Sequence, residues 1–335
     1  MRPKGEVHGW TESQFGRTFV TEWPESKDML LIQGRMCDKT CEVCLEKRLK
    51  ITLLDVVIVA LFAGVCIWIF HRIWVDLHYR WSWSVMPQYL FRYDPDKGSY
   101  VPNLLMKGFF TTLKLSIWAM IFATVLGSIM ALLRISRSLF RRMIGRTYVE
   151  LVRNMPLLVL VFILYFFVSD QIISFIGLDG LVESLSPAAL SLLGFLFCSP
   201  AQLPVFAAGL FTLVLYEGAY ITEIVRAGIV SVDKGQWEAS AAIGLSRWQQ
   251  MRHVILPQAT RTILPPLAGQ LISTIKDSAI VSVISIQELT FQGMELMAAT
   301  YLTFEVWITI TALYFIVTFS LSLGVRALEV SMHRY

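Results

Sequence analysis

The chain has 335 residues, of which 55% are hydrophobic and only 16% are charged, and its mean hydropathy is +0.59. A soluble domain normally carries about 25% charged residues, so this composition indicates a membrane protein. The net charge of +4 is small, and the basic residues lie between apolar runs rather than in one patch, which gives no support to a nucleic-acid partner.

Residues 1–50 are polar, mixed in charge and without the early apolar region of a signal peptide, so we expect a cytoplasmic extension. Three cysteines cluster here, at Cys37, Cys41 and Cys44. Their spacing matches the iron–sulfur triplet of radical-SAM enzymes, but no soluble barrel accompanies it, and we reject that class. Three close thiolates would suit Zn²⁺ or an iron–sulfur cluster, with His8 or a second subunit completing the shell. The alternative is three unligated cysteines next to the membrane, which can carry lipid.

A membrane helix needs about 20 mostly apolar residues. Six stretches meet this requirement, and each is predicted to span the membrane: residues 51–74, 109–133, 155–178, 203–225, 263–286 and 305–328. A further apolar run, residues 188–197, is too short to span and predicts an interfacial or re-entrant helix.

The distribution of lysine and arginine orients these spans. The loops after the second and fourth spans and the C-terminal tail are rich in basic residues, whereas residues 177–202 and 287–304 contain none. Both termini are therefore expected in the cytoplasm, and residues 233–261 are expected to face the same side.

Residues 75–103 then form an external loop with many aromatic side chains. These side chains predict an aromatic belt at the membrane surface, or alternatively a docking surface for an external protein. They are Trp81, Trp83, Tyr89, Phe91 and Tyr93.

The segment 233–261 is polar and basic, yet apolar spans flank it on both sides. Its larger side chains and glycine recur at helical spacing, which predicts a short helix, a turn and a second helix. Gly244 is expected to end or bend the first helix, and Pro257 to break the second just before the next span. The expected helical face consists of Trp237, Ala241, Gly244, Leu245 and Trp248.

Within this segment one motif has a fixed spacing: Glu238-Ala239-Ser240, three residues, Gly244, nine residues, Val254, one residue, Leu256-Pro257. It resembles the "EAA" signature of ABC-importer permease subunits, with two conservative changes, Ser240 for alanine and Val254 for isoleucine. The resemblance continues from residue 102 to the end of the chain. The chain is similar to polar-amino-acid permeases of this family in residues 108–116, 148–158 and 218–228, and in Gly235-Gln236, Leu264-Pro265-Pro266 and Lys276-Asp277-Ser278.

The resemblance implies an all-α membrane protein. It would have the type I ABC-importer core of five transmembrane helices in residues 104–335, with residues 51–74 as an extra N-terminal span. Such a core dimerises with a second permease subunit, identical or different, around a central path in the bacterial inner membrane. Two ATPase subunits dock on a coupling helix, here at about residues 234–245, and an external solute-binding protein delivers a polar amino acid. The chain contains no G-x-x-x-x-G-K-[ST] sequence, so ATP and Mg²⁺ would bind the partner, and the chain is expected not to be an enzyme itself.

Charged residues inside spans are costly and are candidates for function. Lys276 and Asp277, beside Ser278, could line a polar path and meet the carboxylate and ammonium of a substrate, or could form ion pairs that fix the bundle. Glu217 could attract a substrate ammonium or disfavour acidic substrates, and it could equally pair with Lys276 or another basic group, which we favour. Glu223 and Arg226 lie one turn apart and are expected to pair.

Two other classes of protein remain as alternatives. An ion-coupled secondary transporter would use Glu217, Lys276 and Asp277. A membrane-bound metalloenzyme would be centred on the cysteines, but it lacks a second cluster of histidine or cysteine.

Overall fold

The computed structural model describes residues 53–76, 79–96, 98–169, 180 and 185–332. Contacts divide the chain into two units, Met1–Arg80 and Trp81–Tyr335. In the first unit the described helix is α2 (Leu53–Asp76), which lies where the first span is predicted. Apolar side chains are exposed along its first seventeen residues, as on a helix that lipid or another protein covers.

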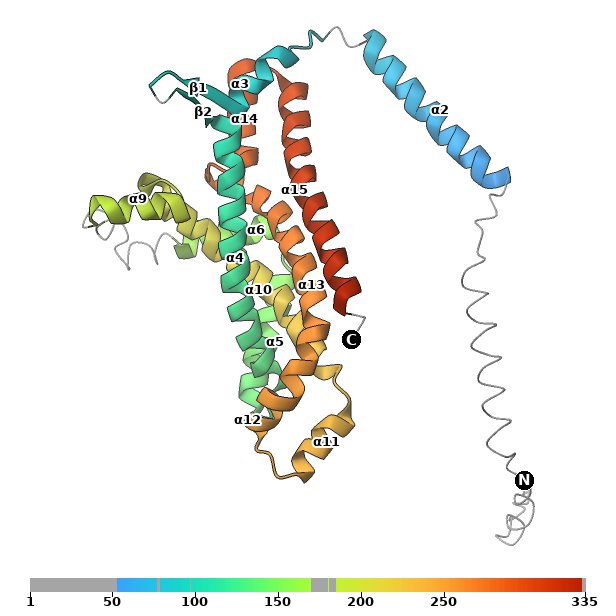
Figure 1. Cartoon of the computed structure of the whole chain (residues 1–335), viewed down its shortest axis with the longest axis vertical. Coiled ribbons are helices and arrows are strands. Elements are labelled where there is room, and N and C mark those ends of the chain that lie inside the picture. The colour runs from blue at the N-terminus through green and yellow to red at the C-terminus, as the bar shows by residue number, and fades with distance from the viewer. Residues whose placement is uncertain (1–52, 77–78, 97, 170–179, 181–184, 333–335) are drawn as a thin grey trace, which may run out of the picture. The chain divides into compact units, whose positions relative to one another are not determined.

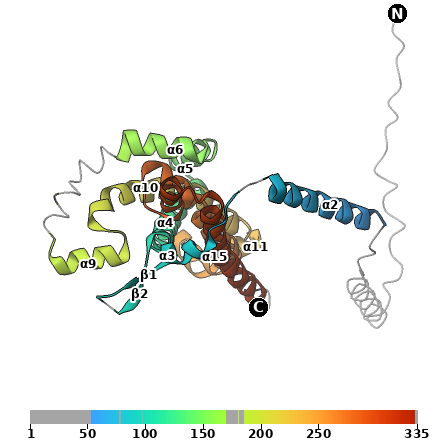
Figure 2. The ribbon, with the colours of Figure 1, turned by 90° about the horizontal axis from the view of Figure 1, so that it is seen from above.

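The second unit is built on four long helices, α4 (Leu104–Ile135), α10 (Leu203–Val230), α13 (Leu256–Asp277) and α15 (Thr303–Met332) (Figures 1 and 2). Each is part of a helical stretch long and apolar enough to cross a membrane. A fifth crossing results if α5 (Leu139–Arg153) and α6 (Leu157–Ile163), which meet at a bend of 110°, form one broken span with the π-helical η2 (Leu164–Ser169). Pro156 lies at that bend, where a proline cannot continue a helix. Four or five crossings are thus found in the described part of the second unit, against five predicted there, and the predicted span 155–178 runs into residues outside the description.

Small residues let α4 and α10 approach closely. Ala123, Gly127 and Ala131 of α4 are buried against the face of α10 that carries Ile221. A Cβ atom on Gly127 would lie 2.7 Å from Cγ2 of Ile221 and 2.9 Å from the carbonyl oxygen of Gly218. Membrane helices commonly use such small residues at their contacts, because apolar burial alone does not drive association in lipid.

At one end of the bundle, the side chain of Glu288 joins three helices through hydrogen bonds. This residue caps α14 (Leu289–Thr300), accepting a hydrogen bond of 2.8 Å from the Phe291 backbone N–H. Its carboxylate also accepts from the hydroxyls of Thr112 on α4, at 3.2 Å, and Tyr314 on α15, at 3.0 Å. Helix α4 and the consecutive helices α14 and α15 therefore meet at one buried carboxylate.

The aromatic segment before α4 is more ordered than the sequence predicts. After η1 (Trp83–Val85) and α3 (Met86–Leu90), strands β1 (Phe91–Asp94) and β2 (Ser99–Pro102) form an antiparallel hairpin, with Phe91 opposite Pro102. The predicted interfacial run 188–197 is also a helix, α9 (Pro187–Leu196), followed by η3 (Pro200–Gln202).

The prediction that Pro257 breaks the second cytoplasmic helix is wrong. Helix α12 (Arg247–Gln249), the π-helical turn η4 (Gln250–Ile255) and α13 are consecutive, and the stretch Arg247–Ile284 passes the test for a single span. Pro257 lies in the first turn of α13, directly after the π turn. A proline is tolerated in the first turn of a helix, because its missing N–H removes little of the helical hydrogen bonding there. The 3₁₀ segment η5 (Ser278–Ile284) then continues α13.

Candidate functional site

The signature motif folds as a capped helix at the end of the bundle opposite the hairpin (Figure 1). Helix α11 (Lys234–Ala242) begins at Asp233, whose carboxylate accepts a hydrogen bond of 2.6 Å from the Gly235 backbone N–H. An aspartate at this position satisfies one of the free N–H groups of the first turn and stabilises the helix by about 1 kcal/mol.

Gly244 ends α11, as predicted. Its φ is +81°, in the left-handed region that glycine adopts without strain. The Gly244 N–H donates to the carbonyl of Ala241, at 3.0 Å, and the Leu245 N–H donates to the carbonyl of Ser240, at 3.2 Å. These two bonds form a Schellman motif, so the glycine of the signature fixes where the chain turns toward α12.

Most of the signature is exposed. Glu238, Ala239 and Gly244 face solvent, whereas Ser240 is 4% exposed and its hydroxyl donates to the carbonyl of Trp237 at 2.9 Å. Trp248, on the helical face that the spacing predicts, is 69% exposed. Ile243, a residue that the pattern did not single out, is 75% exposed. Large apolar side chains exposed beside small ones mark a surface that another protein can cover.

A polar contact joins this helix to the spans. Gln258, in the first turn of α13, donates from its side-chain amide to the side-chain oxygen of Gln236 on α11, at 3.2 Å. Leu256 and Pro257 of the signature lie in the same turn of α13 and are exposed. This hydrogen bond links α11 to the first turn of α13.

The intramembrane charges form a second site. Glu217 of α10 is fully buried, and its Oε2 accepts a hydrogen bond of 2.6 Å from Nε2 of Gln270 on α13. Its Oε1 is buried and has no hydrogen-bond partner among the described residues. The carboxyl group of Asp277 lies close enough to interact with that of Glu217.

The ion pair that we favoured for Glu217 is wrong: no basic side chain among the described residues pairs with it. Helix geometry explains this, because Gln270, Thr274 and Asp277 recur at i, i+4 and i+7 on one face of α13, toward Glu217. Lys276 is turned away from this face and is exposed. Ser278 is buried, with its hydroxyl donating to the carbonyl of Ile275 at 2.8 Å.

Comparison with known proteins decides the family. The family described as "Binding-protein-dependent transport system inner membrane component" matches residues 123–334. The chain belongs to this family. It is 34% identical over 227 residues to the "Probable glutamine ABC transporter permease protein GlnM" of Bacillus subtilis, covering 68% of this chain and 92% of that protein. It is 33% identical over 226 residues to the "Glutamine transport system permease protein GlnP" of Escherichia coli K12, covering 68% and 91%.

A solved structure agrees with this membership. The "Crystal structure of an amino acid ABC transporter with histidines" is matched with a TM-score of 0.54 and 33% identity, covering 68% of this chain and 94% of that one. The resemblance of the sequence to polar-amino-acid ABC-importer permeases and the predicted type I permease fold are thereby confirmed, and the permease is a multi-pass inner-membrane protein.

The permease also carries an ion network that the sequence shows only in part. The predicted pair is present, with Arg226 Nε donating to Glu223 Oε2 at 2.8 Å. Arg134 of α4 pairs with the same carboxylate, and Arg153 of α5 lies 3.9 Å from it. Sequence spacing finds only partners on one helix, so the contacts from α4 and α5 were missed.

The cysteine triplet of the permease, Cys37, Cys41 and Cys44, lies outside the described residues. Within the described ranges, no group of three histidine, cysteine or acidic side chains could hold a metal ion. Zinc or an iron–sulfur cluster at the triplet therefore stays a prediction from the sequence.

Proposed function

We propose that this chain is the membrane-spanning subunit of an ATP-driven importer that moves a polar amino acid into the cytoplasm. Membership in the permease family supports this function, and both relatives named above are glutamine permeases by name. The observation that carries the proposal is the exposed α11–α12 surface, with Ile243 and Trp248 uncovered around a glycine-fixed turn. ATP and Mg²⁺ would bind a separate ATPase.

The proposed assembly contains two ATPase subunits below the membrane, a second permease subunit, identical or different, and an external solute-binding protein. The α11–α12 surface would face the cytoplasm and receive one ATPase, with both chain termini on the same side. Residues 1–50 would be a cytoplasmic extension, residues 51–74 an extra span, and residues 75–103 the external aromatic surface. The basic residues of segments 134–153 and 226–261, which contain α5 and α11, support this orientation.

The substrate path would run past α13. Lys276 is exposed near the end of α13, within a stretch long and apolar enough to cross a membrane, and a charge there is costly unless it faces a polar path. It would meet the carboxylate of an amino acid, and the half-buried Asp277, the next residue of α13, would meet the ammonium group. Glu217 is fully buried and would act on the substrate only through Asp277. Ser278 would hold the end of α13 next to this site.

Transport in proteoliposomes tests the function. The full chain would be reconstituted with a candidate partner ATPase and solute-binding protein, and uptake of labelled L-glutamine would be followed with and without ATP. We expect uptake that requires ATP, the ATPase and the binding protein. Uptake driven by an ion gradient without any ATPase would contradict the proposal and favour an ion-coupled secondary transporter that uses Glu217, Lys276 and Asp277.

A charge on the coupling surface separates coupling from folding. Ile243→Asp should lower ATP-driven uptake at least about tenfold, because the charge must be buried under the ATPase, a cost of more than 1.4 kcal/mol. Arg142→Ala, at an exposed position on α5, serves as the control and should leave uptake unchanged. Equal uptake by the two variants would argue against docking at Ile243.

A further inference from the structure

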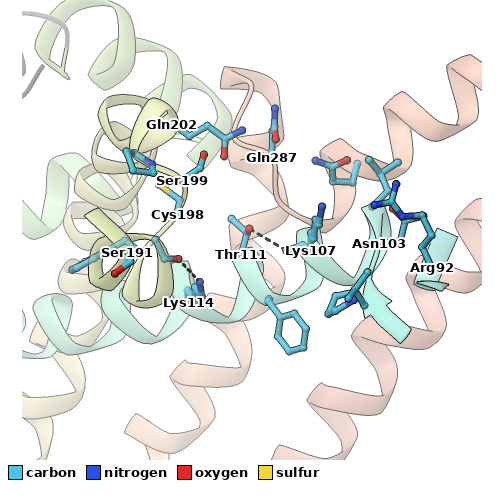
Figure 3. Close-up of a pocket in the computed structure, with 18 of the residues that line it drawn as sticks. Arg92, Asn103, Lys107, Thr111, Lys114, Ser191, Cys198, Ser199, Gln202 and Gln287 are labelled. Carbon is cyan, nitrogen blue, oxygen red and sulfur yellow. Dashed lines mark hydrogen bonds between the residues drawn. The ribbon is translucent and has the colours of Figure 1, made fainter. Parts of the chain in front are cut away.

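A cavity of about 980 Å³ lies in the half of the second unit that carries the hairpin (Figure 3). It opens between the first turns of α4, the hairpin, the α9–η3 segment and the loop before α14. Glu217, Lys276 and Asp277 are not among its lining residues, so the cavity is separate from the proposed path.

The lining is cationic. Arg92 of β1 and Lys107 and Lys114 of α4 contribute three positive charges, against one negative charge from Asp94. Lys114 is engaged, because its Nζ donates a hydrogen bond of 3.0 Å to the carbonyl of Gly194 at the end of α9. Arg92 and Lys107 are exposed, and neither forms an ion pair with any residue of the described ranges. Two cationic groups are thus available to an occupant.

Neutral hydrogen-bonding groups face the same space. Figure 3 shows Thr111 and Lys107 of α4 projecting toward Gln202 and Gln287 on the facing segments. The Thr111 hydroxyl donates to the carbonyl of Lys107 at 3.1 Å, which leaves its oxygen free to accept. Polar groups that converge from separate elements of the fold are what a small polar ligand needs.

One buried acceptor in the lining lacks a donor. Gln292 of α14 is 5% exposed, and its Oε1 is buried without a hydrogen-bond partner among the described residues. The side chain packs against α4 next to Lys107, since a Cβ on Gly108 would lie 2.8 Å from Gln292 Cγ. Buried polar atoms are nearly always paired, and Gln292 lines the cavity, so a small rotation of its side chain would let this oxygen accept an N–H from the occupant.

We propose that this cavity binds a small zwitterion, with its oxyanion against Lys107 and Arg92 and its ammonium group donating to Gln292 Oε1. Two molecules share this chemistry. A free amino acid joins a carboxylate to an ammonium group, and the headgroup of phosphatidylethanolamine joins a phosphate to one. The inference needs neither ATP nor an ATPase, so it stands or falls independently of the transport cycle.

Chemical footprinting of Lys107 tests the proposal on the full chain in nanodiscs. A water-soluble reagent acetylates exposed lysines, and mass spectrometry gives the ratio of modification at Lys107 to that at Lys234, an exposed lysine of α11 far from the cavity. The ratio corrects for reagent that the added amines consume. The starting nanodiscs contain only phosphatidylcholine, whose quaternary ammonium group has no N–H to donate.

The component that protects Lys107 identifies the source of the zwitterion. Protection of Lys107 by L-glutamine in phosphatidylcholine nanodiscs supports the site and assigns it to a free amino acid. Protection only when phosphatidylethanolamine replaces part of the phosphatidylcholine supports the site and assigns it to the lipid headgroup. Equal protection by N-acetyl-L-glutamine or by phosphatidylglycerol, which lack an ammonium group, would overturn the role of Gln292. No protection in any arm would overturn the site.

A variant in the hairpin tests the second cation. Arg92→Gln should raise the amount of the protecting component needed for half-protection of Lys107 about tenfold, because a charge-assisted hydrogen bond is lost. Arg92 is exposed, so the exchange should not disturb folding. Arg142→Gln, an exposed arginine on α5, is the matched control and should behave as the wild type. A shift no larger than that of the control would overturn a site that uses both cations.

Discussion

Gln270 on α13 donates a hydrogen bond of 2.6 Å from its side-chain amide to the carboxylate of Glu217 on α10. The two residues are 53 positions apart in the sequence and belong to two helices that pack in the bundle. The contact places a fully buried carboxyl group at the centre of the polar face of α13.

Removing this amide should destabilise the protein. In Gln270→Leu, both oxygens of the buried Glu217 carboxyl lack a donor, which costs about 1–3 kcal/mol of the free energy of unfolding. Thermal unfolding in detergent measures the loss. Gln258→Leu removes hydrogen bonding by a side-chain amide at an exposed position and should lower the free energy of unfolding by less than about 0.5 kcal/mol. Equal losses in the two variants would contradict a structural role for Gln270.

The ion network at Glu223 should matter more than an exposed pair. Glu223→Gln leaves Arg134, whose side chain is 18% exposed, without its acidic partner, and we expect a loss of about 1–3 kcal/mol in the free energy of unfolding. Glu150→Gln breaks the pair with Arg146, in which the side chains are 55% and 69% exposed, and should cost less than about 1 kcal/mol. The same unfolding measurement ranks the two, and a reversed order would refute the network.

Close packing of α4 on α10 depends on Gly127. A methyl group there would meet the backbone carbonyl of Gly218, which cannot rotate away, so Gly127→Ala should lower the free energy of unfolding by about 1–3 kcal/mol. At Gly324 of α15, an added Cβ meets no atom within 4 Å, and Gly324→Ala should be neutral or slightly stabilising. Equal melting temperatures of the two variants would show that the helices can separate without cost.

Two substitutions of Gly244 separate turn geometry from charge. Asparagine and aspartate both tolerate a positive φ better than other side chains, and nothing lies within 4 Å of the added Cβ. Gly244→Asp should nevertheless abolish ATP-driven uptake, since it places a negative charge where the ATPase must pack, whereas Gly244→Asn should keep a measurable part. Membrane insertion of both variants would be verified by detergent extraction. Normal uptake by the aspartate variant would argue against a coupling role for this turn.

The cysteine triplet makes a separate prediction. If Cys37, Cys41 and Cys44 bind a metal, the purified full chain should contain stoichiometric zinc or iron, because thiolates are the ligands that both prefer. Elemental analysis measures the content, and replacing the three residues by serine should abolish it, while Cys66→Ser on α2 should not. A wild-type chain free of zinc and iron would favour three unligated cysteines.

Local chemistry made much of this protein readable from its sequence. Apolar length predicts the long helices, and the signature at Glu238 predicts a capped helix that ends at Gly244, because both depend on residues near one another along the chain. The same locality explains the correct pair of Glu223 with Arg226, one turn apart on α10.

Only the tertiary structure decided which distant side chains meet. The partner of Glu217 is Gln270 and not Lys276, because the packing of α10 on α13 selects one face of that helix and turns Lys276 away from it. The cavity lined by Arg92, Lys107 and Gln292 brings α14 against β1 and the start of α4, which lie far from it in the chain, and no spacing in the sequence records this approach. Helix length and turn chemistry are local properties of the chain, whereas side-chain partners between helices depend on how those helices rotate and pack.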